Sequence, residues 1–447
     1  MTGVGTSLDF INESVQDVFA RLLTANFTTK PLGFSQDAPQ TARLEKSSLD
    51  TDRSIQSPEL RRPASSDDVV TILQSVVPNL PKILLDPDRI TGTATVISTN
   101  VIAPLFRSRY FPSNVTKSTL KLLYGLSRLP NAPKPWKKDI SDGFNDPKFF
   151  STSLDLVEDG WIPLLKQWVL ADKDRIPDLL SRLTSPTSAG IMFGVGASSA
   201  RLEADRKTQL NLRRIALLIL AATEDTFVTN LAGLEDKLVE LLTATAASSP
   251  SSTTRAEVYM VLRALILKTS AVHLASLWPA INSELQSSIS SILPGEQPDV
   301  YNNLSILQAC KLLDLLLTIA PDEFQLHEWL FITDTIDAVY KPSNWSPVAL
   351  ADKLSEQMGS TASTPSSHIA VTATSASISQ GSRRPLLDLI DTKVLPKEEL
   401  VGKILKPFFS QLSIYAFEST YGMGEPDRQA CIKGLLADIF DDTTMAG

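Results

Sequence analysis

The sequence predicts an all-α protein, built as an irregular α-solenoid of stacked antiparallel helices of the HEAT or armadillo type. Apolar residues recur at helical spacing through most of the 447-residue chain, which gives roughly fifteen helical segments. The alternation of β-branched residues that marks strands is nearly absent. Short breaks separate successive segments, as in stacks of antiparallel helices. No fixed repeat length emerges, so an irregular stack is favoured over a consensus array.

The N-terminal residues 7–30 are predicted to form an amphipathic helix that starts at Ser7. Such a helix either packs on the body of the protein or seeks a membrane surface or a partner. It is poorer in Lys and Arg than lipid-binding helices are, which favours packing. Residues 31–66 lose the helical period and collect Pro, Ser, Asp and Arg, so a linker is expected there.

Three helical regions follow this linker. Ser66, with Asp67 and Asp68 after it, has the composition of a helix cap with acidic residues in the first turn. Prolines punctuate the helical segments that this cap opens and that continue to Phe111. The further regions are 114–129 and 136–183.

A loop rich in small residues, 185–200, contains the pattern Gly194-x-Gly196-x-x-Ser199. This pattern resembles a dinucleotide-binding motif whose last glycine is replaced. The motif needs a βαβ unit around it, and no β-rich neighbourhood is present. A flexible loop between helices is therefore favoured over a nucleotide site.

The central block holds the most strongly apolar helices. Residues 201–222 and 224–246 are predicted as an antiparallel pair, followed by 257–269, 273–293 and 304–320. In the last of these, polar residues form only one narrow stripe, so neighbours must cover the helix on several sides. Pro279 either kinks the helix 273–293 or starts it.

The C-terminal part alternates helices with a low-complexity segment. Predicted helices are 346–357, which starts at Ser346 with Pro347 in its first turn, then 385–394, 397–419 and 425–440, with Pro426 in its first turn. Residues 359–382 are dominated by Ser, Thr, Ala and Gly, so disorder is expected there. The predicted domains are an N-terminal helix and linker (1–66), a helical core (67–345), a short helix with the Ser/Thr-rich insert (346–384), and C-terminal helices that pack on the core (385–447).

Composition and charge narrow the class of protein. Hydrophobic residues make up 43% of the chain and charged ones 21%, as in folded globular proteins. A net charge of −8 argues against a general nucleic-acid binder. Cys310 and Cys431 lie far apart, a reduced and intracellular pattern. The longest apolar run, 215–222, is far shorter than the ~20 residues of a membrane span, and no secretory signal opens the chain.

Side chains that carry chemistry are sparse. The chain has three His, at 273, 327 and 368, and none has a second His or Cys at metal-ligand spacing. Cys310 lies in an apolar helix, which favours an inert buried thiol over a nucleophile. Neither GxxxxGK[ST] nor GxSxG occurs. The sequence therefore predicts no enzyme, no catalytic residues, no cofactor and no metal.

Basic residues on neighbouring predicted helices give the one indication of binding. They could line a groove for anionic lipid headgroups or for an acidic partner segment. The alternative is solvated faces and internal ion pairs with Glu203, Asp205, Glu257 or Asp314, and it is favoured because single surface charges usually contribute little. The candidate lipid- or partner-binding residues are Lys137, Lys138, Arg206, Lys207, Arg213, Arg214, Arg263 and Lys268.

Several stretches resemble the C-terminal region of the Dopey family of membrane-trafficking proteins. The LxSLWP pattern, together with QACKLLDL, is the most specific of them. The matching stretches are PWKKDISDGFNDPKFF (135–150), Trp161, ADKDRIPDLLSRL (171–183), RAEVYMVLRALILKTSAVHLASLWPAINSEL (255–285), QACKLLDLLL (308–317) and FQLHEWLFITD (324–334). Members of that family are much longer, so this chain looks like a C-terminal fragment.

The resemblance implies a cytoplasmic protein, peripheral on Golgi and endosomal membranes, that acts in endosome-to-Golgi transport. The partners it implies are a large scaffold related to Arf guanine-nucleotide exchange factors and an aminophospholipid flippase. It also implies contacts with phosphoinositide and with kinesin light chain, and it offers no catalytic motif to transfer. The expected function is a non-enzymatic scaffold, with an anionic phospholipid (phosphoinositide) headgroup-binding module as the alternative. Self-association is left open.

Overall fold

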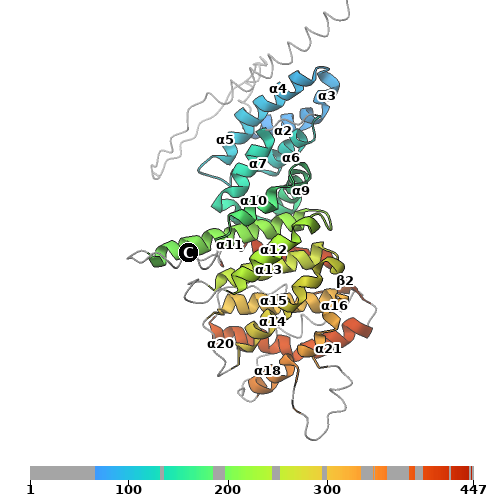
Figure 1. Ribbon diagram of the computed structural model, residues 1–447. Helices are drawn as coiled ribbons and strands as arrows, with labels where there is room; N and C mark the ends of the chain where they lie inside the picture. The colour runs from blue at the N-terminus through green and yellow to red at the C-terminus, as the bar shows by residue number, and fades with distance from the viewer. Residues whose placement is uncertain are drawn as a thin grey trace, which may run out of the picture. The chain divides into compact units, whose positions relative to one another are not determined.

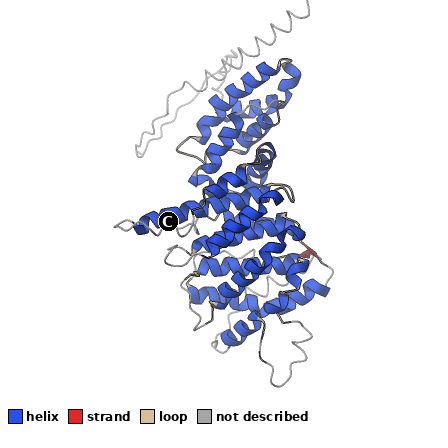
Figure 2. Cartoon of the chain, in the orientation of Figure 1, coloured by secondary structure: helices blue, strands red, loops and turns tan. Residues whose placement is uncertain are grey.

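The computed structural model (Figure 1) describes residues 66–130, 135–184, 197–243, 252–293, 300–333, 346, 348–359, 382–387, 396–421, 424–441 and 444. These residues are largely helical, which confirms the all-α class (Figure 2). The only strands among them are a parallel pair of two residues each, β1 (Ser382–Arg383) and β2 (Glu425–Pro426). The chain divides into two compact units, 1–145 and 146–447.

The N-terminal unit is a small helical cluster in which α2 packs against α6, and α7 packs against α5 and α6. Thr116 caps α6 by accepting a hydrogen bond from the Thr119 backbone N–H, and Asp86 caps α4 in the same way. Its elements are α2 (Ser66–Val76), η1 (Val77–Asn79), α3 (Leu80–Ile83), α4 (Pro87–Ile97), η2 (Ser98–Ile102), α5 (Ala103–Phe106), α6 (Lys117–Ser127) and α7 (Pro135–Asn145).

The C-terminal unit is larger, and its helices pack in sequence: α9 against α11, α11 against α13, and α13 against α15. A second set packs on them, α10 on α11, α12 on α13 and α14 on α15, and α18 packs against α14 and α21. Its elements are η3 (Pro147–Ser151), α8 (Leu154–Leu156), η4 (Val157–Trp161), α9 (Ile162–Ala171), α10 (Arg175–Ser181), α11 (Ala197–Ala221), η6 (Val228–Asn230), α12 (Leu231–Leu242), α13 (Thr253–Lys268), η7 (Ala271–Leu277), α14 (Trp278–Ser290), α15 (Asn303–Ile319), α16 (Asp322–Gln325), η8 (Glu328–Leu330), α18 (Leu350–Gly359), α20 (Lys397–Glu399), η9 (Leu400–Leu405), α21 (Lys406–Tyr421) and α22 (Arg428–Ile439).

The core of this unit centres on α13 and α15. Every residue of α13 from Thr253 to Leu267 is buried, and so is every residue of α15 from Ser305 to Thr318. Helix α15 touches α13, α14 and α21, which confirms that its apolar circumference is covered on several sides. A capping box starts it: Asn302 accepts from the Ser305 backbone N–H, and the Ser305 hydroxyl accepts from the Asn302 N–H.

The last helix of the chain, α22, returns to the middle of the unit. It packs against α13 and α11, although more than 150 residues separate α13 from it in the sequence. In Figure 1 it belongs to the red C-terminal end of the chain, whereas α11 and α13 are green and yellow-green. This return places C-terminal side chains among the central helices.

Two predicted helix starts are wrong, because in both cases the helix begins further along the chain. A single helix over 224–246 was expected, but Asp225 takes a left-handed conformation (φ 59°), and its carboxylate accepts from the Ser270 backbone N–H. The helix α12 therefore begins only at Leu231. Pro426 was expected in the first turn of the last helix. It lies in β2 instead, and Asp427 caps α22 by accepting from the Ala430 N–H.

The remaining predicted boundaries are partly confirmed, partly shifted and partly outside the described residues. Helix α14 begins at Trp278 with Pro279 in its first turn, which confirms that this proline starts a helix rather than kinking one. The helix expected from Ser346 begins at Leu350. The segments 7–30, 31–65, 185–196, 360–381 and 388–395 lie outside the described residues, as does Pro347. The expected division into four parts stays a prediction.

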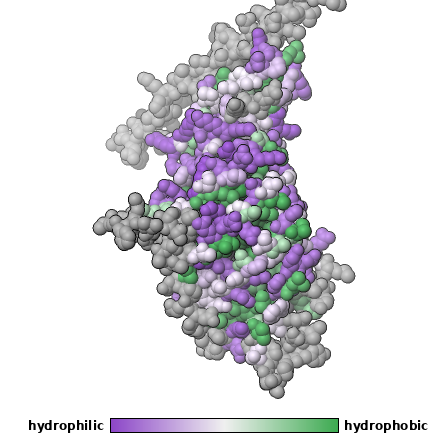
Figure 3. Space-filling model, in the orientation of Figure 1, coloured by the Kyte–Doolittle hydropathy of each residue, from purple (hydrophilic) through white to green (hydrophobic). Residues whose placement is uncertain are grey.

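No helix within the described ranges is long and apolar enough to cross a bilayer. On the face seen in Figure 3, hydrophobic side chains reach the surface in patches between hydrophilic ones. Large apolar residues that are exposed among the described residues include Leu85, Leu326 and Trp329.

Candidate functional site

Three core helices carry cationic side chains that are almost completely buried. Arg213 lies on α11, Arg263 on α13 and Lys311 on α15, with 0%, 1% and 3% of their surface exposed. A buried cation is costly unless a carboxylate or several acceptors surround it. The structure must therefore supply anions at this place.

The C-terminal helix supplies one of those anions. Asp438 on α22 accepts from Arg263 Nη1 at 2.5 Å through Oδ2, and from Lys311 Nζ at 2.6 Å through Oδ1. Gln308 Oε1 also accepts from Arg263 Nη1, at 2.9 Å. Burial alone would raise the pKa of Asp438, but Lys311 and Arg263 outweigh burial and lower the pKa below 3.8. One carboxylate thus joins α22 to α13 and α15.

Arg213 is held by the next helix and by the end of the chain. Its Nε and Nη2 donate to Glu257 on α13 at 2.9 and 2.8 Å, and its Nη1 donates to the backbone carbonyls of Ile439 and Asp441 at 2.9 and 2.8 Å. The last carbonyls of a helix lack partners within it and attract cations. The hydroxyl of Thr444 accepts a further hydrogen bond from Nη2 at 2.6 Å.

Two more of the eight candidate basic residues are wholly or partly buried. Arg214 lies over the ring of Phe150 and donates to Asn211 Oδ1 at 3.0 Å, and burial lowers its pKa to about 10. Lys268 is half-buried and donates to the Ala222 carbonyl at 3.1 Å, and burial again lowers its pKa. Both side chains therefore make contacts within the chain.

The remaining candidates are more accessible. Arg206 and Lys207 are exposed on α11, where Lys207 Nζ lies 3.5 Å from Glu203 Oε1. Lys138 is exposed on α7 of the N-terminal unit, and Lys137 beside it is half-buried against the Trp136 ring. The structure therefore joins Arg213 and Arg263 through α22. Binding of a lipid or partner at the accessible candidates stays a prediction.

Sequence reasoning missed Asp438 and Lys311 as site residues. Lys311 gave a signal, since it belongs to the narrow polar stripe of an otherwise apolar helix, where a charge must be paired. Asp438 gave none, because its partners lie 127 and 175 residues away in the sequence.

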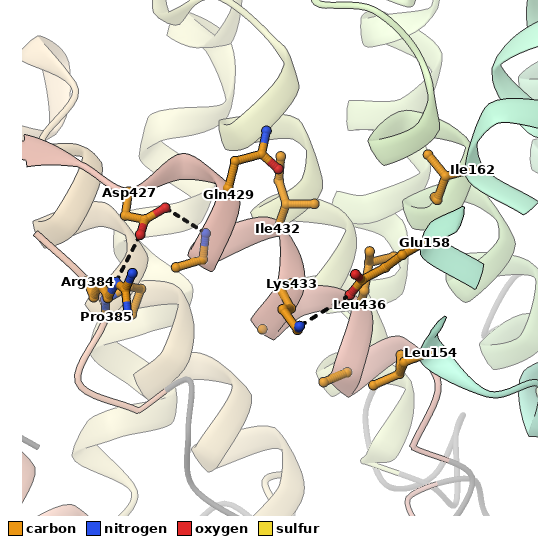
Figure 4. A pocket seen from close by; sticks show the side chains of 13 residues that line it. Leu154, Glu158, Ile162, Arg384, Pro385, Asp427, Gln429, Ile432, Lys433 and Leu436 are labelled. Atoms are coloured by element: carbon orange, nitrogen blue, oxygen red, sulfur yellow. Dashed lines mark hydrogen bonds and ion pairs between the residues drawn. The ribbon is translucent and has the colours of Figure 1, made fainter. Parts of the chain in front are cut away.

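A pocket of about 770 Å³ lies along the outer side of α22, within the C-terminal unit (Figure 4). Its walls come from α22, from the segment around α8 and η4, and from the residues after β1. The lining residues are Leu154, Glu158, Ile162, Arg384, Pro385, Asp427, Gln429, Ala430, Ile432, Lys433, Gly434, Leu436 and Ala437.

Two ion pairs border this pocket. Arg384 Nε donates to Asp427 Oδ2 at 2.9 Å at the start of α22, and Lys433 Nζ lies 4.0 Å from Glu158 Oε1 further along the helix (Figure 4). The Ala430 N–H, with help from Arg384, lowers the pKa of Asp427. Asp427 is therefore ionised near neutral pH, and it both caps the helix and holds Arg384.

The described residues offer little for bond-making chemistry. No cluster of three or more His, Cys, Asp and Glu suited to a metal ion occurs among them. Burial raises the pKa of the Cys310 thiol far above its usual range, so the thiol stays protonated. Gly194 and Gly196 of the glycine pattern lie outside the described residues. What the described site offers is an apolar trough between charges, which suits binding.

Comparisons with known proteins show that the chain is similar to DOP1 proteins. A protein-family model described as DOP1 C-terminal matches residues 10–422. Protein dop1 of Emericella nidulans is 51% identical over 439 residues, which is 98% of this chain and 23% of that protein. Protein DOP1 of Saccharomyces cerevisiae is 27% identical over 79% of this chain and 20% of its own length. Protein DOP1B of Mus musculus is 24% identical over 48% and 10%.

No solved structure matches the chain. The chain spans about a quarter or less of the length of these relatives. The family match covers most of the chain, and it confirms the resemblance to the C-terminal region of Dopey proteins. The chain therefore belongs to the DOP1, or Dopey, family.

Proposed function

We propose that this chain is a non-catalytic docking region of a membrane-trafficking protein, acting as a scaffold that binds protein partners. We further propose that its helices form an irregular α-solenoid of the HEAT or armadillo type. Family membership supports the trafficking role, and the order in which α9, α11, α13 and α15 pack supports the solenoid.

The observation that carries the docking role is the trough along α22. It joins an apolar surface to charged side chains at its border, which is the composition of protein-binding sites. By contrast, the cations of the central helices are already neutralised by Glu257, Asp438 and backbone carbonyls. The buried cations and their acceptors stabilise the fold, whereas the trough offers a surface that a protein partner could bind.

The partners proposed are those that the family resemblance implies: a large scaffold related to Arf exchange factors and an aminophospholipid flippase. The place of action would be the cytoplasmic face of Golgi and endosomal membranes, in endosome-to-Golgi transport. The purified chain should co-elute with one of these two purified partners in size-exclusion chromatography. Co-elution with neither, by a chain with native helical content, would refute the proposal.

A second candidate function is recognition of anionic lipid headgroups. The exposed neighbours Arg206 and Lys207 favour it, because both point their charges to solvent on one helix. Charge reversal at Arg213 or Arg214 would not test it, since both side chains are buried and their loss would disturb the fold. The test is flotation with phosphatidylinositol-phosphate vesicles at two salt concentrations. Salt-sensitive binding that Arg206→Glu/Lys207→Glu removes would support lipid recognition, and binding that this variant retains would refute it.

A further inference from the structure

We infer that the pocket along α22 is a docking site for an acidic, apolar polypeptide segment of a protein partner. The inference rests on the proposed docking function and adds the place and the chemistry of recognition. It depends on the shape of the pocket, on the unequal exposure of its charges, and on the rigidity of its wall.

The floor of the pocket suits apolar side chains. Leu154, Ile162, Ile432 and Leu436 line it together with Pro385 and with small residues of α22. Its volume of about 770 Å³ lies within the range of roughly 300–1,000 Å³ that ligand sites cover. Several apolar side chains of a partner segment fit into such a volume.

The border of the pocket exposes its cations more than its anions. The side chains of Lys433 and Arg384 are 70% and 49% exposed, whereas those of Glu158 and Asp427 are 34% and 20% exposed. An incoming segment therefore meets the two cations first. This difference favours carboxylates on the partner.

Both cations keep donors available for such carboxylates. Lys433 and Glu158 are 4.0 Å apart, and Glu158 Oε1 is buried without a hydrogen bond from any described residue, so the pair is only loosely coupled. Lys433 can turn toward a partner carboxylate with three N–H donors. Arg384 donates to Asp427 through Nε, and its Nη groups form the rest of the guanidinium fork.

The spacing of the cations favours a polypeptide over a single phosphate. Arg384 is paired with Asp427, and Lys433 follows Asp427 six residues later, so the positions that carry the two ion pairs differ by a rise of roughly 9 Å at 1.5 Å per residue. A helix with two carboxylates on one face, or an extended strand, spans this separation. A single phosphate group is shorter than this rise.

The wall that carries these groups is held in place before binding. The Asp427 cap fixes the start of α22, and Asp438 and the carbonyl of Ile439 fix its end on the core. A rigid site loses little conformational freedom on binding, which raises its affinity for a given contact area.

The experiment selects short peptides from a random phage-displayed library against the whole chain, and measures the affinity of enriched peptides by fluorescence anisotropy. We expect these peptides to combine Asp or Glu with Leu, Ile or Phe. Arg384→Glu and Lys433→Glu should each weaken binding about tenfold, because attraction at a partly desolvated pair becomes repulsion. Lys403→Glu is the matched control, since Lys403 is as exposed (66%) but lies on η9 and does not line the pocket.

Ala430→Trp tests the trough without changing its charge. It should abolish binding of the same peptides while circular dichroism and hydrogen exchange of α22 stay unchanged. If the charge variants weaken binding and Ala430→Trp does not, attraction is diffuse and the pocket assignment is overturned. Enriched peptides without acidic residues, or pocket variants with unchanged affinity, would overturn it as well.

Three further outcomes separate this inference from the proposed function. If the pocket variants bind the scaffold or flippase as the native chain does, the pocket assignment falls and the docking function stands. If phosphatidylserine vesicles compete with the peptides and bind the chain through Lys433, the pocket takes lipid and the polypeptide assignment is overturned. If the native chain binds neither protein partner, the proposed function fails, whatever the pocket does with peptides.

Discussion

Replacing Asp438 with Ala removes the carboxylate that neutralises two buried cations at once. Lys311 loses the ion pair at 2.6 Å, and Arg263 loses its ion pair at 2.5 Å and keeps its hydrogen bond to Gln308. Removing one partner of a buried ion pair typically costs about 3–5 kcal/mol. Because two cations share Asp438, we expect a loss of about 4 kcal/mol or more in the free energy of unfolding of the C-terminal unit. Folded domains have only about 5–15 kcal/mol in total.

In the native protein, the stability that Asp438 contributes should depend on pH. The pKa of Asp438 lies below 3.8, so its ionised form is bound more favourably in the folded chain than in the unfolded one. The stability that Asp438 contributes is therefore complete above the pKa of the unfolded carboxyl, and it is lost as pH falls through the lower folded pKa. The stability of the Asp438→Ala variant should therefore fall less steeply than that of the native protein as pH is lowered through this range.

The assay is urea unfolding together with hydrogen exchange resolved by peptide. The two units need not unfold together, so exchange in α13, α15 and α22 reports on the C-terminal unit, and exchange in α6 serves as the internal reference. Asp178→Ala is the control, because Asp178 forms only surface pairs with Arg175 and Arg182 and should contribute less than about 1 kcal/mol. A loss below about 1 kcal/mol for Asp438→Ala would refute the reasoning. In the double variant Asp438→Ala/Lys311→Met, part of the lost free energy of unfolding should be recovered, because the Lys311 charge left without Asp438 is then removed.

Further predictions concern single buried or capping groups. Burial raises the pKa of Asp139 to about 6, although the hydrogen bond from Ser98 acts in the opposite direction. The folded chain therefore holds the proton of Asp139 more tightly than the unfolded chain does, and the stability of the N-terminal unit should fall as pH rises from 3.8 through about 6. Asp139→Asn should flatten that fall in melting temperature, and an unchanged pH profile would contradict the assignment. Cys310, at 0% exposure, should resist iodoacetamide until urea unfolds the chain, and mass spectrometry showing rapid labelling of the native protein would count against it. Asn302→Ala should cost about 1 kcal/mol in urea unfolding, since Ser305 loses its cap, and an unchanged midpoint would argue against the capping box.

Much of the helical content follows from local patterns, because apolar periodicity acts within a few turns. The burial of α15 follows from its single polar stripe, and the burial of Cys310 follows from that helix. The internal ion pair of Arg213 with Glu257 was among the alternatives that the sequence offered, and the structure confirms it. These predictions succeed because each rests on neighbours in the chain or on the cost of a buried charge.

The site beside α22 was not predictable from those patterns. Its walls come from residues around Leu154, Arg384 and Lys433, and no periodicity relates segments so far apart in the sequence. The late start of the helix expected from residue 224 has the same origin, since the conformation of Asp225 is held by a hydrogen bond from Ser270. Long-range contacts of this kind appear only once the chain is folded.

The docking pocket can be tested most directly by photo-crosslinking from inside it. A photoreactive benzoylphenylalanine in place of Gln429, which lines the pocket, would be placed in the full-length protein in cells, with the same group at Lys403 as the control. We predict a protein adduct from position 429 that the selected acidic peptide suppresses and that position 403 does not give. Adducts that are equal at both positions, or that contain only lipid, would contradict a polypeptide-docking site on this helix.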